Sequence, residues 1–158
     1  MSDASILSEA DRRRIEGWRE SGARIVFTNG VFDLIHRGHV EYLAESRAFG
    51  NCLVVGINSD ASARRLGKGD GRPLVAAADR AAVLAALRSV DLVVVFDDDT
   101  PERLIREVRP DVLTKGGDWP KEAIAGGAFV ESCGGEVVSV PLRQGFSTTA
   151  LVERMRRV

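Results

Sequence analysis

The chain has 158 residues, 44% of them hydrophobic, and a formal net charge of −1. This is the size of one domain with a buried core, and the near-neutral charge argues against a protein that coats nucleic acid. No apolar run reaches the roughly 18–20 residues that span a bilayer, and residues 1–14 are too polar for a secretory signal. The two cysteines, Cys52 and Cys133, form no CxxC pair. We therefore expect reduced thiols in a cytoplasmic protein that binds neither nucleic acid nor a membrane.

Hydrophobic periodicity predicts the elements in chain order. An amphipathic helix is expected over residues 8–20, with Ser8 as its N-cap and Gly22 close after its end. Short, continuously apolar runs are typical of strands buried on both faces, and they occur at 24–28, 52–57, 92–96, 112–114 and 136–141. Helical patterns follow these runs at 40–49, 79–88, 101–108, 122–132 and 148–157.

This strand–helix alternation predicts the fold class. Right-handed crossovers between such strands give an α/β, Rossmann-like, doubly wound sheet of five parallel strands. We expect a single domain over residues 1–158, with a helical extension over 1–23 and the functional core over 24–158. Ligands in such sheets bind beyond the carboxyl ends of the strands.

The connection over residues 59–77 is unusually long and rich in glycine and cations. Its basic residues are Arg64, Arg65, Lys68 and Arg72. Long connections in compact domains are often functional, so we interpret this one as a flap that closes over phosphates. A solvated surface loop is the alternative.

Both histidines of the chain, His36 and His39, flank Gly38 just after the first predicted strand. If a helix starts near Arg37, both rings lie at its first turn, where free N–H groups and the helix dipole attract phosphate. Gly38 lets a ligand approach the backbone closely. The two imidazoles could then donate hydrogen bonds to an α-phosphate under attack. One buried structural histidine and one exposed histidine is the alternative.

The segment TNGVFD, residues 28–33, leads off the end of the first predicted strand. Asn29-Gly30 is a turn signal, so we expect the backbone to leave the sheet there. Residues 28–39 would then lie where a nucleotide binds.

Two further clusters follow later strands at the same predicted edge. In KGGDW, residues 115–119, the lysine supplies a cation, the glycines permit close approach, and Trp119 offers a stacking face; a turn with Trp119 in the core is the alternative. In RQGFSTT, residues 143–149, Ser147 or Thr148 could cap the last helix, which is compatible with phosphate binding there.

The acidic run Asp97, Asp98 and Asp99 precedes Thr100 and Pro101. Three carboxylates can indicate a metal site. A helix start, with Thr100 as N-cap, Pro101 as first helical residue and acids at the positive end of the dipole, fits the same residues. We favour the helix start.

Taken together, the segments FTNGVFDLIHRGHVEYL, LTKGGDW and GFSTTALVERM resemble the cytidylyltransferase-like nucleotidyltransferase superfamily. Within it, they are most similar to the D-glycero-β-D-manno-heptose 1-phosphate adenylyltransferase (ADP-heptose synthase) family. The resemblance runs from about Arg24 to the C-terminus. It implies an enzyme with a Rossmann-like fold. Such an enzyme would use Mg²⁺ to transfer AMP from ATP to heptose 1-phosphate, a step of lipopolysaccharide biosynthesis.

The resemblance also implies roles for individual residues. The expected catalytic residues are His36, His39 and Lys115. The expected nucleotide-binding residues are Thr28, Asn29, Gly30, Val31, Phe32, Gly38, Gly116, Gly117, Asp118, Trp119, Ser147, Thr148 and Thr149. The residues expected to bind the substrate or a phosphate are Asp33, Lys68, Arg72, Arg80 and Arg143, with the role of Asp33 left open. No metal ligand from the protein is expected, because the phosphates would hold Mg²⁺.

The expected partners are ATP, heptose 1-phosphate and a second copy of the chain in a homodimer. The chain has no room for the sugar kinase that often precedes this domain, so a separate heptose kinase is expected. A cytidylyltransferase acting on glycerol 3-phosphate remains an alternative. So does a non-catalytic nucleotide sensor, although the chain lacks both G-x-G-x-x-G after the first strand and a P-loop.

Overall fold

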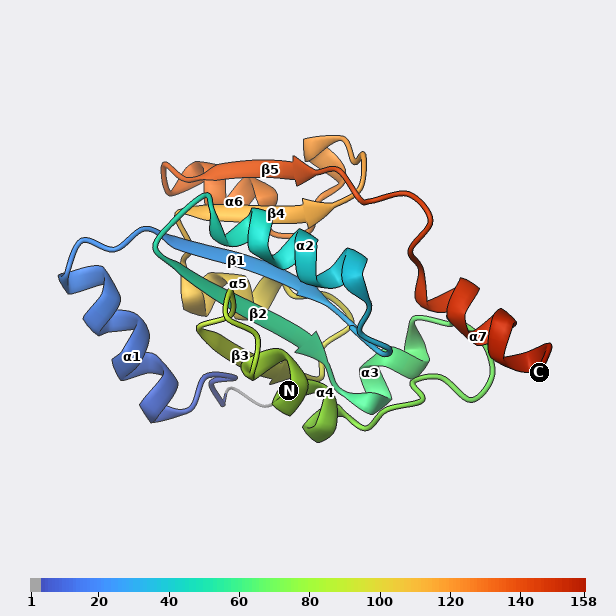
Figure 1. Cartoon of the computed structure of the whole chain (residues 1–158). Helices are drawn as coiled ribbons and strands as arrows, with labels where there is room; N and C mark the ends of the chain where they lie inside the picture. The colour runs from blue at the N-terminus through green and yellow to red at the C-terminus, as the bar shows by residue number, and fades with distance from the viewer. Residues whose placement is uncertain (1–3) are drawn as a thin grey trace.

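The computed structural model describes residues 4–158 and contains one sheet of five parallel strands (Figure 1). The strands lie in the order β3-β2-β1-β4-β5, and their bounds are β1 Ile25–Gly30, β2 Cys52–Asn58, β3 Leu92–Phe96, β4 Val112–Gly116 and β5 Glu136–Val140. In the register, Phe27 of the central strand β1 pairs with Val54 on one side and with Leu113 on the other. The predicted α/β, doubly wound parallel sheet is confirmed.

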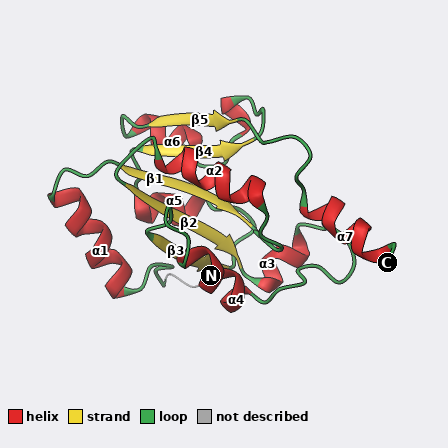
Figure 2. Cartoon of the chain, in the orientation of Figure 1, coloured by secondary structure: helices red, strands yellow, loops and turns green. Residues whose placement is uncertain are grey.

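Helices cover both faces of this sheet (Figure 2). Their bounds are α1 Glu9–Glu20, α2 Arg37–Arg47, α3 Asp60–Arg65, α4 Ala77–Ala85, α5 Glu102–Val108, η1 Lys121–Ala123, α6 Gly127–Ser132 and α7 Thr148–Arg156. One core cluster joins α1, α5 and α6 to the sheet through residues such as Ile15, Ile105 and Val130. The other joins α2 and α4 to the opposite face through Leu43 and Leu84.

Two helices at the chain ends differ in how they are held. The predicted cap of α1 is confirmed, because the Ser8 hydroxyl accepts from the Asp11 amide and the Asp11 side chain accepts from the Ser8 amide. Ile15 anchors α1 in the core with 2% of its surface exposed. By contrast, α7 buries no residue completely and projects from the body of the chain beyond the sheet (Figure 1).

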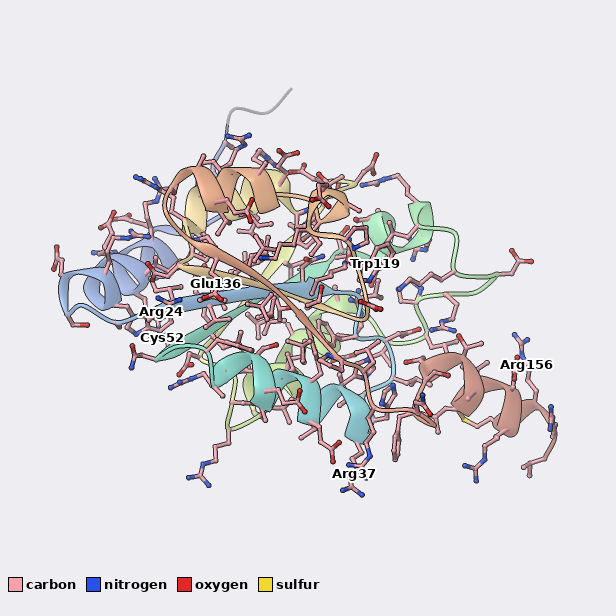
Figure 3. All side chains as sticks on the ribbon, turned by 90° about the horizontal axis from the view of Figure 1, so that it is seen from above. Arg24, Arg37, Cys52, Trp119, Glu136 and Arg156 are labelled. Atoms are coloured by element: carbon pink, nitrogen blue, oxygen red, sulfur yellow. The ribbon has the colours of Figure 1, made fainter. Side chains whose placement is uncertain are left out.

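Labelled side chains mark the two ends of the sheet (Figure 3). At the amino end, Arg24 donates to Glu136 at 3.1 Å, which ties the start of β1 to the start of β5. Trp119 and Arg37 lie at the other end, where the strands finish (Figure 3). None of the helices described between residues 4 and 158 has the length and apolar character that crossing a bilayer requires.

Several local predictions were wrong. Asn29-Gly30 is not a turn, because β1 continues through both residues and pairs them with Gly56 and Ile57 of β2. The expected helix over 122–132 is broken into η1 and α6, because Gly126 adopts a left-handed φ of 80°. The connection after β2 does not begin as a loop, since residues 60–65 form α3.

The start of α5 also differs from the prediction. The N-cap is Pro101 rather than Thr100, because the Pro101 carbonyl accepts the first helical hydrogen bond from Ile105 at 2.9 Å. Two of the neighbouring carboxylates form ion pairs with arginines: Arg103 pairs with Asp98 at 2.7 Å, and Arg65 pairs with Asp99 at 2.6 Å.

Candidate active site

A cavity of about 250 Å³ opens at the carboxyl end of β1, where most of the predicted site residues lie. Three segments that are far apart in sequence form its walls: the turn after β1 with the start of α2, the connection after α3, and the connection into α7. The lining residues are Val31, Phe32, Asp33, His36, Gly38, His39, Ala63, Lys68, Arg72, Pro73, Leu142, Arg143, Phe146, Ser147, Thr148 and Thr149. Most of the residues predicted to bind phosphate therefore meet in one place.

The two histidines lie at the start of α2, which begins at Arg37 as expected. Their rings stack with centroids 3.8 Å apart and an interplanar angle of 23°. The backbone amide of His36 donates to Nδ1 of His39 at 3.3 Å. Because Nδ1 of His39 is the acceptor, the neutral ring carries its proton on Nε2, which remains a hydrogen-bond donor.

The surroundings favour the neutral form of both imidazoles. Burial, followed by repulsion from His36 and Lys68, lowers the pKa of His39 to about 4. Burial also lowers the pKa of His36. Within the described part of the chain, Nδ1 of His36 is a buried polar atom without a hydrogen-bond partner. A bound ligand or water could supply that partner.

Glycines make room for the rings of this cluster. A Cβ on Gly38 would lie 2.9 Å from Cε1 of His36 and 3.0 Å from Cβ of Phe146. A Cβ on Gly30 would lie 2.9 Å from the ring of Phe32. Gly30 is therefore required by ring packing rather than by a turn. Phe32 itself has a left-handed φ of 52°, which turns its ring back toward His39, with the centroids 5.3 Å apart.

The connection after α3 brings two cations to the cavity. Lys68 lines it and is close enough to His39 and Lys115 to lower the pKa of both. Arg72 lines it as well and pairs with the buried Asp33 at 2.8 Å. The positions of these side chains are compatible with binding to an anionic ligand.

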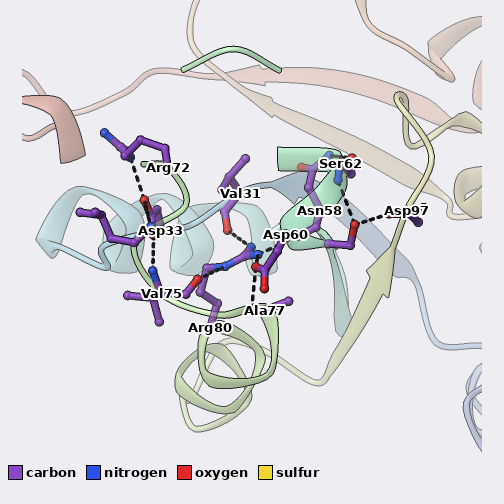
Figure 4. Close-up of polar contacts among 12 residues, drawn as sticks. Val31, Asp33, Asn58, Asp60, Ser62, Arg72, Val75, Ala77, Arg80 and Asp97 are labelled. Carbon is purple, nitrogen blue, oxygen red and sulfur yellow. Dashed lines mark hydrogen bonds and ion pairs between the residues drawn. The ribbon is translucent and has the colours of Figure 1, made fainter. Parts of the chain in front are cut away.

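Arg80 does not reach the cavity, which departs from its expected contact with a phosphate. It is 1% exposed, and its guanidinium donates to the carbonyls of Val31, Asn58 and Val75 and to the Asp60 carboxylate at 2.7–2.9 Å (Figure 4). Every nitrogen of the group is therefore occupied by the protein, and Arg80 joins the ends of β1 and β2 to the connection above them.

Thr28 is also placed away from the cavity. Its hydroxyl lies in a buried polar network with the hydroxyl of Tyr42 at 2.5 Å and the carbonyl of Thr114 at 3.1 Å. Because strand side chains alternate between faces, this residue supports α2 beneath the site rather than lining it. Asn29 is partly buried at the end of the same strand and does not line the cavity.

The predicted cluster over residues 115–119 begins in the last two residues of β4, and none of its residues lines the cavity. Burial, and then repulsion from Lys68, lowers the pKa of Lys115. Trp119 is 49% exposed, and its Nε1 donates to the Gly116 carbonyl at 3.1 Å. Gly117 has a φ of 102°, and a Cβ there would lie 3.1 Å from Nε1 of Trp119. Asp118 is exposed in the same turn.

The connection into α7 forms the opposite wall. Ser147 caps α7 by accepting from the Ala150 amide at 3.0 Å, and Thr148 donates to the Leu34 carbonyl at 3.2 Å. Arg143 pairs with Glu41 of α2 at 2.7 Å, so part of its charge is already neutralised. Arg37 pairs with the same carboxylate, at 2.6 Å.

Sequence reasoning did not predict four of the lining residues: Ala63, Pro73, Leu142 and Phe146. The sequence could have indicated Phe146, because it directly precedes Ser147 and so lies next to the expected phosphate site. The other three carry no chemical signal. They line the cavity only because of where the chain passes.

We compared the chain with models of protein families to find which family has such a site. A family model described as cytidylyltransferase-like matches residues 27–154. The chain belongs to the cytidylyltransferase-like family of nucleotidyltransferases. Both the superfamily resemblance and the enzyme class predicted from the motifs are thereby confirmed.

Relatives within this family are similar over nearly the whole chain. The bifunctional protein HldE of Geotalea uraniireducens (strain Rf4) is 53% identical over 156 residues, which cover 98% of this chain and 32% of that protein. HldE of Nitrobacter hamburgensis is 54% identical over 142 residues, covering 90% of this chain and 29% of the relative. The chain thus spans about a third of the length of the HldE proteins it matches.

A solved structure shares the family fold. The lipopolysaccharide core biosynthesis protein from Thermoplasma volcanium GSS1 superimposes with a TM-score of 0.64 at 30% sequence identity. The match covers 77% of this chain and 98% of that protein.

Proposed function

We propose that the chain transfers AMP from ATP to D-glycero-D-manno-heptose 1-phosphate, giving ADP-heptose and pyrophosphate. The observation that carries the proposal is the orientation of His39 in the cavity: its Nδ1 accepts the His36 amide, so the neutral ring carries its donor proton on Nε2. The similarity to HldE proteins and to a lipopolysaccharide core biosynthesis protein supports the sugar phosphate as acceptor.

The proposed reaction is a direct displacement. An oxygen of the sugar phosphate forms a bond to the α-phosphorus of ATP, and the bond from that phosphorus to the bridging oxygen of the β-phosphate breaks. Pyrophosphate leaves with the electron pair of that bond. Such transfers depend on positioning and on stabilisation of the negative charge that gathers on the phosphoryl oxygens.

Residues of the cavity supply both effects in this proposal. His39 donates from Nε2 to an α-phosphate oxygen, and His36, stacked on it, borders the same group. Lys68 in the cavity and Lys115 beside it offset the charge of the phosphates, and a bound phosphate would relieve the repulsion between these two cations. The N-terminus of α7, capped by Ser147, offers amide donors to phosphate oxygens.

We also propose that Mg²⁺ enters with ATP. The donor set of the cavity fits a metal–nucleotide complex rather than a bare ion, because its charged groups are mainly cationic and its buried carboxylate, Asp33, is engaged by protein donors. Among residues 4–158, no group of three or more His, Cys, Asp and Glu side chains could hold a metal. When bound, Mg²⁺ neutralises charge on the phosphates.

A pyrophosphate-release assay tests the proposal. ATP and CTP are each incubated with heptose 1-phosphate, glycerol 3-phosphate or no acceptor, and His39→Ala serves as the inactive control. We expect release only with ATP and heptose 1-phosphate. Release with CTP and glycerol 3-phosphate would establish the cytidylyltransferase alternative. Tight nucleotide binding with no release on any acceptor would establish a sensor.

Two partner proposals accompany this function. A sugar kinase reaction has to supply the heptose 1-phosphate, since the acceptor is itself a phosphate ester. We further propose a homodimer, which light scattering coupled to size-exclusion chromatography would test; a single species of monomer mass would refute it.

A further inference from the structure

Two carboxylates accept hydrogen bonds from the connection between α3 and α4, part of which lines the cavity. Asp60 accepts hydrogen bonds from the Ala77 amide at 3.0 Å and from Arg80 at 2.8 Å. Asp33 accepts hydrogen bonds from residues 72–75, the stretch that precedes Ala77 (Figure 4). The two anchors differ in one respect, because only Asp33 contacts a side chain that lines the cavity.

The carboxylate of Asp33 is fully engaged by protein donors. Its Oδ1 accepts from the amides of Leu74 at 2.8 Å and Val75 at 2.9 Å, and its Oδ2 accepts from Nε of Arg72 at 2.8 Å. Its side chain is 2% exposed. Burial raises the pKa of Asp33, but these hydrogen bonds outweigh burial and lower it overall. An ionised carboxylate in this setting is a poor candidate for a general base or a metal ligand.

Arg72 turns one edge of its guanidinium to Asp33 and keeps the other edge free. Only Nε is bonded, and no residue in the described part of the chain accepts from Nη1 or Nη2. The side chain is 15% exposed and lines the cavity with Lys68 and His39. The Nη edge of a guanidinium matches two oxygens of a phosphate, and a bound Nε fixes its direction.

We propose that Asp33 is a positioning residue that directs the free edge of Arg72 at a substrate phosphate, so that Arg72 binds the phosphate and Asp33 acts only through Arg72. The proposal rests on the proposed function for the identity of the substrates. The chemistry shared by the two substrates is a phosphate group, which belongs either to the nucleotide or to the sugar phosphate.

Calorimetric binding without turnover distinguishes these sources. Inorganic pyrophosphate represents the nucleotide side and heptose 1-phosphate the acceptor side. We expect Arg72→Ala to weaken one of the two by on the order of 10- to 100-fold, the loss expected for charge-assisted hydrogen bonds. Unchanged affinity for both probes, or no binding of either to the wild type, would overturn the proposal.

A double-mutant cycle tests whether Asp33 acts through Arg72. Asp33→Asn places an amide where the carboxylate was, so it should weaken the affected probe on the order of tenfold in the wild type. In the Arg72→Ala background the same change should cause no further loss. An equal loss in both backgrounds would show that Asp33 acts independently, which overturns the proposal.

Two more variants keep the test decisive. Arg72→Lys retains the charge but not the fork, so it should bind nearly as weakly as Arg72→Ala; wild-type affinity would refute the proposal even if Asp33→Asn fails to fold. Asp70→Asn removes the same charge from an exposed position in the same connection and should leave binding unchanged. Because binding is read without catalysis, a chain with no adenylyltransferase activity would refute the proposed function and leave this test standing.

Discussion

The rings of His36 and His39 lie face to face, with their centroids 3.8 Å apart, while the His36 amide donates to Nδ1 of His39. One residue thus fixes both the orientation and the tautomer of the other. Two imidazolium ions could not occupy this position without strong repulsion, so the stack itself favours neutral rings. A neutral ring with its proton on Nε2 can stabilise a phosphoryl transition state without giving up that proton.

Loss of either ring is expected to affect turnover more than binding. His39→Ala and His36→Ala should each lower kcat on the order of 10²–10³-fold, the usual cost of removing one preorganised donor, with little change in KM for ATP. Steady-state kinetics measures both parameters, and circular dichroism verifies the fold. Near-normal kcat in both folded variants would contradict the mechanism.

Stability should depend on pH through His39. The pKa of this ring is about 4 in the folded chain, against the ordinary 6.5 expected after unfolding. The unfolded chain therefore binds more protons between these values, and the contribution of His39 to stability, complete above about pH 6.5, is lost as the pH falls toward about 4. Urea unfolding at pH 7, 6 and 5 should show a shallower decline for His39→Gln than for the wild type. Parallel declines would argue against the lowered pKa.

Lys68 is expected to contribute to nucleotide binding through its charge. Lys68→Ala should raise KM for ATP on the order of tenfold at low salt and by less at high salt, because the contact is ionic. Lys121→Ala, an exposed position on η1, is the matched control. Hydrogen exchange in residues 66–71 should slow on adding ATP and Mg²⁺. Exchange that does not respond to saturating ligand would contradict a closing flap.

Arg80 should matter for stability rather than for phosphate binding. Arg80→Met removes the guanidinium donor from three carbonyls and leaves Asp60 with only the Ala77 amide, so we expect a loss of about 2–4 kcal/mol in the free energy of unfolding. Arg13→Met removes an exposed ion pair with Glu9 and should cost less than about 1 kcal/mol. Urea titration compares the two, and equal losses would count against the role of Arg80.

Removal of divalent ions should separate activity from folding. We expect excess chelator to abolish pyrophosphate release, because Mg²⁺ would enter with the nucleotide. The melting temperature should not change, since residues 4–158 contain no group of three or more metal-ligating acids, histidines and cysteines. Full activity in chelator, or a drop in melting temperature, would refute this assignment of the metal to the substrate.

Local patterns in the sequence determined the architecture of this protein. Five apolar runs with helical patterns between them predicted the parallel sheet, because strands buried on both faces are continuously apolar. Such burial holds for β1, β2 and β4 over most of their length, whereas the edge strands β3 and β5 are partly exposed. The HRGH segment likewise predicted the helix start at Arg37 and the pair of histidines there. Both signals depend on residues close together in the chain, so they can be read without a structure.

Only the tertiary structure decided which polar residues face the cavity. Arg72 and Arg80 are close in sequence, yet Arg72 lines the cavity beside Asp33, 39 positions away, while Arg80 on α4 is buried against the Val31 carbonyl, 49 positions away. The same holds for Thr28: the sequence predicted it in the nucleotide site, but in the fold its hydroxyl contacts Tyr42 and Thr114. Burial and hydrogen-bond partners depend on contacts between distant segments, and these form only when the sheet brings the segments together.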